Sequence, residues 1–221
     1  MKWYDICNRI SLLLHALVSA AGYFLIEAIS RHSFTEAWDF MTGRPLVFAY
    51  NAALIFTSSL IVYLFRRRCF IRVLLVMFWL LLGIINGVIL ATRVTPFTGP
   101  DLHLITDAMK IANKYLPVAG VVAVCILFGI LVILLLMLLI KGPKYQKKIK
   151  YRYNIPLILL AVALFAGSTQ LALEKRVLSN YFGNIAFAYE DYGYPYCLAT
   201  TIFNTGICCP RDYSEKEIKR I

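Results

Sequence analysis

The chain has 221 residues, of which 60% are hydrophobic and 16% are charged, and its formal net charge is +11. Charged residues usually make up about a quarter of a soluble domain, so this composition excludes a single soluble globular fold. The positive charge is concentrated in short segments between long apolar blocks, so we expect no nucleic-acid partner.

Five apolar blocks of roughly 20 residues match the length needed to cross about 30 Å of hydrocarbon. The first block follows basic residues and could be a secretory signal. Its apolar stretch is longer than that of a typical signal and further blocks follow, so we expect it to be retained. The sequence therefore predicts an all-α polytopic membrane domain at residues 1–174, with short amphipathic helices on the outer face. The five predicted transmembrane helices span about residues 10–29, 45–65, 71–92, 117–140 and 155–173.

The basic residues predict the orientation of these helices. Lysine and arginine cluster in residues 66–72 and 141–152, whereas loops 30–44 and 93–116 carry fewer basic residues, offset by acidic ones. Loops rich in lysine and arginine stay on the cytoplasmic side of a membrane. We therefore expect a multi-pass plasma-membrane protein with a cytoplasmic N-terminus and an extracellular C-terminal segment. The basic loops also favour contact with anionic lipids.

Few polar residues interrupt the predicted spans. His15 lies in the first of them, and an ionisable residue inside a membrane is a functional candidate by default. A packing or interfacial role is the favoured interpretation, because His15 lies close to Arg9. Asn51, Asn86 and Gly87 are expected to allow close helix contacts and hydrogen bonds between helices. No Asp, Glu, Lys or Arg lies at mid-membrane in any predicted span, which disfavours a transporter.

Residues 175–221 follow the last predicted span and are rich in tyrosine and phenylalanine, with glycines and prolines that break regular structure. We predict an extracellular linker rather than a compact domain. Cys197 could form a disulfide with Cys208 or Cys209, which would leave one cysteine over. Residues 214–217 have the spacing of a capping box, so we expect a new helix to begin there and more protein to follow it.

The turn after the third predicted span and the aromatic run after the fifth resemble motifs of the lipoteichoic acid synthase family. These proteins are polyglycerol-phosphate transferases of Gram-positive bacteria. The resemblance covers essentially the whole chain, but only the membrane-embedded N-terminal part of that family. It is carried by an R-x-T-P-F-x-x-x-D pattern and a Tyr-Gly-Tyr-Pro-Tyr run, at Arg93, Thr95, Pro96, Phe97, Asp101 and Tyr192–Tyr196.

The resemblance implies an extracellular sulfatase-like catalytic domain with a threonine nucleophile and a divalent metal, Mn²⁺ or Mg²⁺. That domain moves glycerol phosphate from phosphatidylglycerol onto a growing chain. The present sequence holds no cluster of Asp, Glu and His around a threonine, so no catalytic residue, metal ligand or cofactor is assigned in it. Its expected partners are phosphatidylglycerol, other anionic lipids and its own catalytic domain, and the chain alone is expected to be inactive.

Within that resemblance, the expected lipid-headgroup-binding residues are Arg93, Thr95, Asp101 and His103. A guanidinium can hold two phosphate oxygens at once, and the threonine and histidine side chains can bind glycerol hydroxyls. The plainer interpretation is that Arg93 only reaches toward the interface and Asp101 only caps a surface helix. Three aromatic residues are expected to dock the linker on the catalytic domain: Tyr192, Tyr194 and Tyr196.

Two other functions remain open. Phosphoethanolamine transferases also join a membrane domain to a phosphatase-like outer domain, although the Thr-Pro-Phe turn disfavours this class. The second alternative is a non-catalytic polytopic scaffold or regulator that binds partners through its outer surface helices. Two such helices are predicted, at about residues 34–40 and 102–112, where apolar residues recur at helical spacing.

Overall fold

The computed structural model describes residues 11–103, 118–145 and 148–203, with the backbone alone at residue 103 and at 118–128. All regular secondary structure in this described part is helical, and it contains no strand. Its elements are α2 (Ser11–Ser30), α3 (Phe34–Gly43), α4 (Pro45–Ser59), η1 (Leu60–Leu64), α5 (Arg68–Leu90), α6 (Gly99–His103), α8 (Val118–Lys141), α9 (Tyr151–Glu174), α10 (Ile185–Tyr192) and α11 (Tyr194–Phe203).

Four of the helical segments are long and apolar enough to cross a membrane. The predicted all-α membrane class is therefore confirmed at this level. The fourth predicted span coincides with α8, but the described apolar part of that helix, Gly129–Lys141, is shorter than the others. A count of five spans stays a prediction. The four candidate spans are Ser11–Ser30, Pro45–Leu64, Arg68–Leu90 and Tyr151–Glu174.

The start of the last predicted span differs from the structure. The last span begins at Tyr151 rather than at 155, so that Pro156 lies inside the helix. Proline usually marks a first helical turn because it has no N–H to donate, and this preference placed the predicted start too late. The predicted helix at 34–40 is present as α3, where the Ser33 side chain accepts from the Glu36 N–H at 3.2 Å and caps the N-terminus. The predicted helix at 102–112 lies almost entirely outside the described residues.

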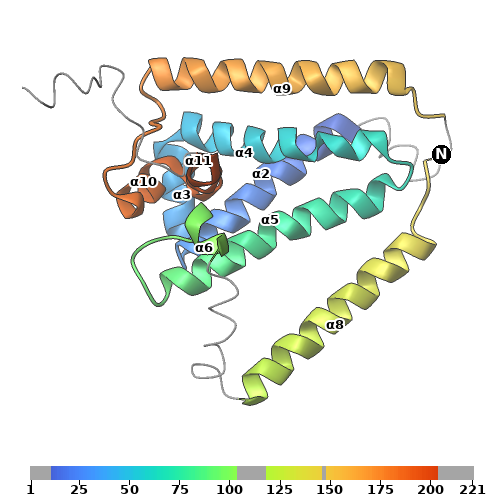
Figure 1. The fold of residues 1–221 in the computed structure, drawn as a ribbon, viewed down its shortest axis with the longest axis horizontal. Helices are drawn as coiled ribbons and strands as arrows, with labels where there is room; N and C mark the ends of the chain where they lie inside the picture. Colours follow the sequence, from blue (N-terminus) through green and yellow to red (C-terminus); the bar gives the residue numbers. More distant parts are fainter. Residues whose placement is uncertain (1–10, 104–117, 146–147, 204–221) are drawn as a thin grey trace, which may run out of the picture.

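Helix α2 lies at the centre of the bundle, between α4 and α5 (Figure 1). Two glycines of α5 face it: a Cβ on Gly87 would lie 2.8 Å from the Ile29 carbonyl oxygen, and one on Gly83 would lie 3.0 Å from the Ile26 side chain. Small residues at these positions allow two membrane helices to approach closely. His15 of α2 packs against α4, with its ring 5.1 Å from that of Phe56, which agrees with the packing interpretation.

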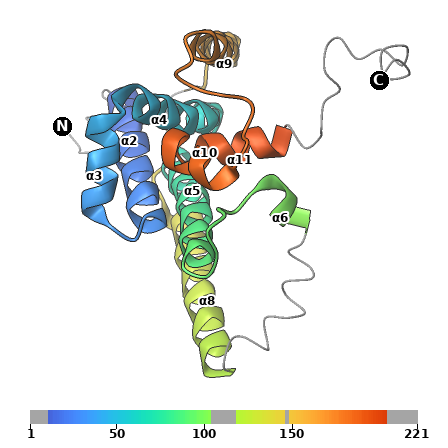
Figure 2. The ribbon, with the colours of Figure 1, turned by 90° about the vertical axis from the view of Figure 1, so that its left-hand side faces the viewer.

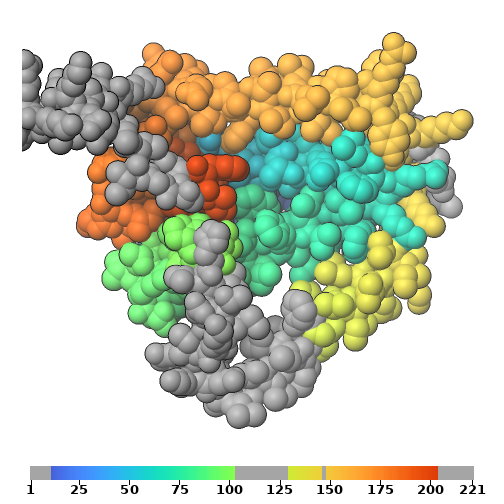
Figure 3. Space-filling view, viewed as in Figure 1, coloured from blue at the N-terminus to red at the C-terminus, as the bar shows by residue number. Residues whose placement is uncertain are grey.

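Helices α8 and α9 lie at the edges of this bundle. Helix α9 runs along α4 and forms a ridge at one side of the space-filling view, and α8 contacts α5 on the opposite side (Figures 1 and 3). Tyr50 of α4 joins α9 through a hydroxyl contact with Thr169 at 2.9 Å and through stacking on Phe165. None of the residues in the apolar window of α9 is buried in the described protein. That surface suits a helix that faces lipid on most sides.

The two ends of the bundle differ in character. We call the end covered by α6, α10 and α11 the capped end, and the end where α5 begins, next to Arg66–Arg72, the basic end (Figures 1 and 2). Residues 177–203, which lie within the predicted linker, pack against the helices at the capped end (Figure 3). Their aromatic side chains provide apolar surface that is buried between α2, α4 and the turn after α5.

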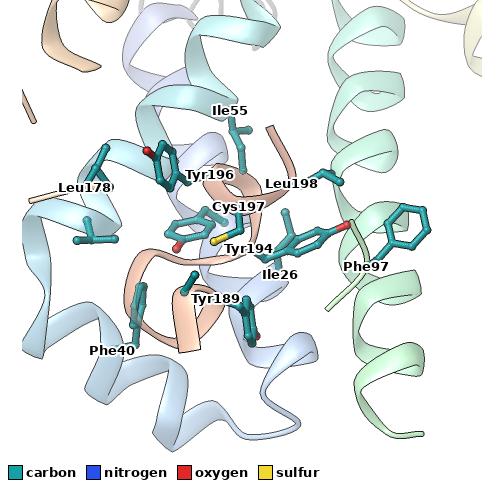
Figure 4. Packing of buried hydrophobic residues seen from close by; sticks show 13 residues of the cluster. Ile26, Phe40, Ile55, Phe97, Leu178, Tyr189, Tyr194, Tyr196, Cys197 and Leu198 are labelled. Atoms are coloured by element: carbon teal, nitrogen blue, oxygen red, sulfur yellow. The ribbon is translucent and has the colours of Figure 1, made fainter. Parts of the chain in front are cut away.

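The hydrophobic core therefore lies at the capped end and combines residues from both halves of the chain (Figure 4). Tyr194 is completely buried, and Tyr196, Cys197 and Leu198 are each at most 5% exposed. Burial of an aromatic or leucine side chain contributes roughly 1.5–3 kcal/mol, which makes α11 a principal source of stability at this end. The buried cluster comprises Tyr23, Ile26, Phe40, Val47, Ile55, Phe97, Leu178, Ala188, Tyr189, Tyr194, Tyr196, Cys197 and Leu198.

Candidate functional site

The turn between α10 and α11 is buried between α2 and α4 and is held there by their side chains. Gly193 has a φ of +78°, which favours glycine, and α11 starts directly after it. The Tyr194 N–H donates to Glu27 Oε1 at 3.0 Å, and the Tyr196 N–H donates to Asn51 Oδ1 at 2.8 Å. The proline between them has no N–H. Side chains of two other helices thus satisfy first-turn donors that would otherwise lack partners.

Glu27 is the charged residue at the centre of this contact. It is fully buried, and its Oε2 accepts from Arg31 Nε at 2.9 Å. The Arg31 guanidinium lies 4.4 Å from the centre of the Phe40 ring and donates to the Glu190 carbonyl at 3.2 Å. A carboxylate beside the N-terminus of α11 is also favoured by the dipole of that helix. This pair therefore joins α2 to α3, α10 and α11.

Asn86 holds the turn after α5 in a similar way. Its fully buried side chain donates to Ser30 Oγ at 3.0 Å and accepts from the Phe97 N–H at 2.8 Å. Farther along the turn, the Gly99 N–H donates to Thr201 Oγ1 at 3.0 Å, and a Cβ on Gly99 would lie 2.6 Å from the Thr201 carbonyl oxygen. The turn after α5 is therefore packed directly against α11.

Arg93 and Asp101 form an ion pair beside this packed turn. Arg93 Nη2 lies 2.6 Å from Asp101 Oδ2, and the same guanidinium donates to the carbonyls of Thr95 at 3.0 Å and Pro96 at 3.1 Å. Asp101 Oδ2 also accepts from the N–H and the hydroxyl of Thr98, at 2.8 and 2.9 Å. The Arg93 side chain is 42% exposed, so the part of the guanidinium not used in these bonds faces outward.

The charges at this site follow from burial and hydrogen bonding. Burial would raise the pKa of Asp101, but hydrogen bonds from Arg93 and Thr98 outweigh it and hold this pKa below its ordinary value. Burial, together with the nearby charge of Asp101, raises the pKa of the Tyr194 phenol. Burial also raises the pKa of Tyr196 to about 12. At neutral pH the ionised Asp101 carboxylate therefore lies near the neutral phenol of Tyr194.

The structure places the predicted site residues in two neighbouring groups. The ion pair comes together with Thr95, which contributes its backbone carbonyl, whereas His103 ends α6 with its side chain outside the described residues. Tyr194 and Tyr196 lie in the core (Figure 4). Tyr192 packs against Tyr196 with ring centres 6.2 Å apart. Headgroup binding and docking on a further domain both stay predictions.

Three residues at this end were not assigned a site role from the sequence. Glu27, Asn51 and Asn86 are all completely buried and all accept hydrogen bonds from the backbone of distant segments. The sequence carries a signal for them, because polar residues within or at the ends of apolar spans need partners. It does not say which segments supply those partners.

Cys197 is a buried free thiol, and burial raises its pKa, which disfavours the nucleophilic thiolate. Its predicted disulfide partners, Cys208 and Cys209, lie outside the described residues. Among the residues that the structure describes, no group of three His, Cys, Asp or Glu is placed to hold a metal ion. The candidate site therefore consists of the Arg93–Asp101 pair and the buried polar contacts that fix its turn.

The low pKa of Asp101 predicts a contribution to stability that depends on pH. A carboxylate with a lowered folded-state pKa stabilises the protein fully above its ordinary pKa of 3.8, and this stabilisation is lost as the pH falls through the lower folded value. Asp101→Asn should lower the free energy of unfolding at neutral pH by about 1 kcal/mol, since the pair is partly exposed. The difference between wild type and variant, measured by thermal unfolding in detergent, should shrink in acid. A difference that is unchanged in acid would contradict this origin.

Comparison of the chain with protein-family models, with curated proteins and with solved structures finds no match.

Proposed function

We propose that this chain is the membrane domain of a lipoteichoic acid synthase-like phosphoglycerol transferase. In this proposal the protein lies in the plasma membrane of a Gram-positive bacterium and crosses it five times, with the capped end outside. It anchors an extracellular sulfatase-like catalytic domain and positions the headgroup of phosphatidylglycerol, or of the growing glycerol-phosphate lipid, beneath it. The Mn²⁺ or Mg²⁺ needed for transfer would belong to that catalytic domain.

The observation that supports this proposal most directly is the fixed, half-exposed guanidinium of Arg93. Two backbone carbonyls and Asp101 hold its orientation, so little side-chain entropy remains to be lost when a ligand binds. It follows the last turn of α5, one of the candidate spans, which is where a lipid phosphate would lie. Because Asp101 neutralises part of its charge, we expect selectivity for a headgroup that also offers hydroxyls, such as glycerol phosphate.

Packing of the turn supports the same proposal. Within the R-x-T-P-F-x-x-x-D pattern Arg93 pairs with Asp101, and the Phe97 N–H donates to Asn86 in the last turns of α5. Gly99, within the same pattern, contacts α11 through Thr201. A headgroup site on this turn would therefore be rigidly joined to the segment that leads toward the proposed catalytic domain.

Lipid selectivity of the purified protein tests this function. Native mass spectrometry with equal amounts of phosphatidylglycerol and phosphatidylethanolamine should show selective retention of phosphatidylglycerol by the wild type. Arg93→Ala should reduce this retention roughly tenfold, because charge-assisted hydrogen bonds are lost. Arg44→Ala is the matched control, since Arg44 also lies at the capped end in an exposed ion pair, 2.7 Å from Asp191. Equal retention of both lipids by all three proteins would leave an anchor without a headgroup site.

A further inference from the structure

The basic end of the bundle contains an open cavity of about 520 Å³, lined by Arg66, Arg67, Lys144 and Tyr145. It lies where the η1–α5 connection meets the connection between α8 and α9. The Tyr145 N–H donates to the Arg66 carbonyl at 2.7 Å, so the two connections are joined by a backbone hydrogen bond. The cavity is therefore formed by two segments far apart in the sequence and fixed in relation to each other.

The charge around this cavity is positive, and none of the described ion pairs involves its arginines or its lysine. Residues 66–72 and 141–152 contain no Asp or Glu. The three ion pairs found in the described part of the chain all lie at the capped end, on Arg31, Arg44 and Arg93. Like charges so close together repel each other unless an anion lies between them.

Three guanidinium nitrogens at the basic end are buried without a described acceptor, and one of them belongs to Arg67, which lines the cavity. Arg67 Nη1, Arg68 Nε and Arg72 Nε have no hydrogen-bond partner among the described residues. The Arg68 guanidinium stacks over the Tyr145 ring, 3.7 Å from its centre, while Arg72 Nη2 donates to Ser11 Oγ at 3.0 Å. A buried donor without a partner costs about 1–3 kcal/mol, and more when it is charged. A ligand with several hydrogen-bond acceptors would remove this cost by accepting from these donors.

The N-terminus of α5 adds a second reason for an anion at this place. Helix α5 has 23 residues and begins at Arg68, and the preceding residue, Arg67, makes no side-chain capping bond. The first N–H groups of such a helix are free to donate, and its dipole places partial positive charge there. Helix N-termini with these properties bind phosphate in many proteins.

We propose that the cavity at the basic end binds a phosphate group, held by Arg66, Arg67 and Lys144 at the N-terminus of α5. Phosphate fits this site because its oxygens can accept from a planar guanidinium, an ammonium and backbone N–H groups together. The phosphate could belong to the headgroup of a membrane lipid or to a free phosphate ester. This site lies at the opposite end from Arg93, and its existence does not depend on the function proposed above.

Titration of the full chain in neutral detergent tests the site. The lipid probe is dioctanoyl phosphatidic acid, the free probe is glycerol 3-phosphate, and neutral dioctanoylglycerol controls for the acyl chains. Arg67→Gln and Lys144→Gln should each weaken phosphatidic acid binding roughly tenfold, measured by isothermal titration calorimetry. Arg152→Gln removes the same charge from an exposed position in the first turn of α9, outside the cavity, and should bind like wild type.

The two probes distinguish the source of the phosphate. Binding of phosphatidic acid alone, weakened by the cavity variants, would identify a lipid headgroup, and equal binding of glycerol 3-phosphate would identify a free ester. Equal weakening in Arg152→Gln and the cavity variants would overturn the proposal, because it would show only bulk electrostatic attraction. Absence of binding by wild type would also overturn it. If Arg67→Gln does not fold, Lys144→Gln is sufficient, because Lys144 is exposed and makes no described hydrogen bond.

Discussion

Replacing Gly193 by alanine is expected to destabilise the protein by about 3 kcal/mol or more. The residue has a φ of +78°, which strains any residue with a Cβ by roughly 1–3 kcal/mol. The added Cβ would also overlap the Tyr23 hydroxyl and lie 3.0 Å from Asn51 Nδ2 and 3.1 Å from Glu27 Oε1. Overpacking of a filled site adds a further 1–3 kcal/mol. The free energy of unfolding, measured by titration with SDS in mixed micelles, checks this value.

Gly183→Ala is the matched control for that experiment. Gly183 lies in the same segment before α10, and a Cβ there would meet no atom within 4 Å. Its replacement should change the stability by less than about 0.5 kcal/mol, as is usual for open surface positions. Equal effects of the two substitutions would mean that the turn between α10 and α11 is not docked between α2 and α4.

The comparison of these two glycines shows how far the sequence predicts this fold. Each follows an aromatic residue in the same segment, and no neighbouring residue shows that only Gly193 is packed against two other helices. Apolar blocks predicted the long helices, because the period and length of such blocks depend only on neighbouring residues. The role of Gly193 depends on Glu27 and Asn51, which are more than 140 residues away along the chain.

The candidate site likewise has one part that the sequence predicts and another that it does not. Arg93 and Asp101 are eight residues apart, and both were assigned to the site from one short motif. The packing of residues 177–203 could not be predicted, since a segment rich in tyrosine is compatible with both a linker and a buried cap. The structure distinguishes the two, because the buried oxygens of Glu27 and Asn51 accept hydrogen bonds from the backbone of this segment.

The two ends of the bundle differ in how their described arginines are paired. At the capped end Arg31, Arg44 and Arg93 each form an ion pair with a carboxylate of the protein. A headgroup bound there would therefore be recognised by the few donors that these pairs leave free. At the basic end one buried guanidinium nitrogen of each of Arg67, Arg68 and Arg72 has no acceptor among the described residues. We therefore expect the affinity for simple phosphate anions to be greater at the basic end, and selectivity among headgroups to be greater at the capped end.

Replacing Glu27 by alanine is expected to lower the free energy of unfolding by about 3–5 kcal/mol, the range found when one partner of a buried ion pair is removed. The substitution would leave the Arg31 guanidinium, which is only 13% exposed, without its carboxylate. It would also leave the Tyr194 N–H at the start of α11 without an acceptor. Glu27→Gln keeps an oxygen for Tyr194 but removes the charge, so its effect should be smaller. Titration with SDS measures the stability, and amide hydrogen exchange at Tyr194 measures the local opening.

Glu190→Ala is the control that separates this contact from the general loss of a negative charge. Glu190 is exposed in α10, and only its backbone carbonyl contacts Arg31, so the substitution leaves that hydrogen bond in place. Stability and exchange at Tyr194 should then stay close to wild type. If Glu27→Ala were as stable as Glu190→Ala, with Tyr194 still protected, the buried pair would not hold α11 against the bundle. Faster exchange at Tyr194 in Glu27→Ala alone would instead show that a single carboxylate in α2 fixes the segment beside Arg93.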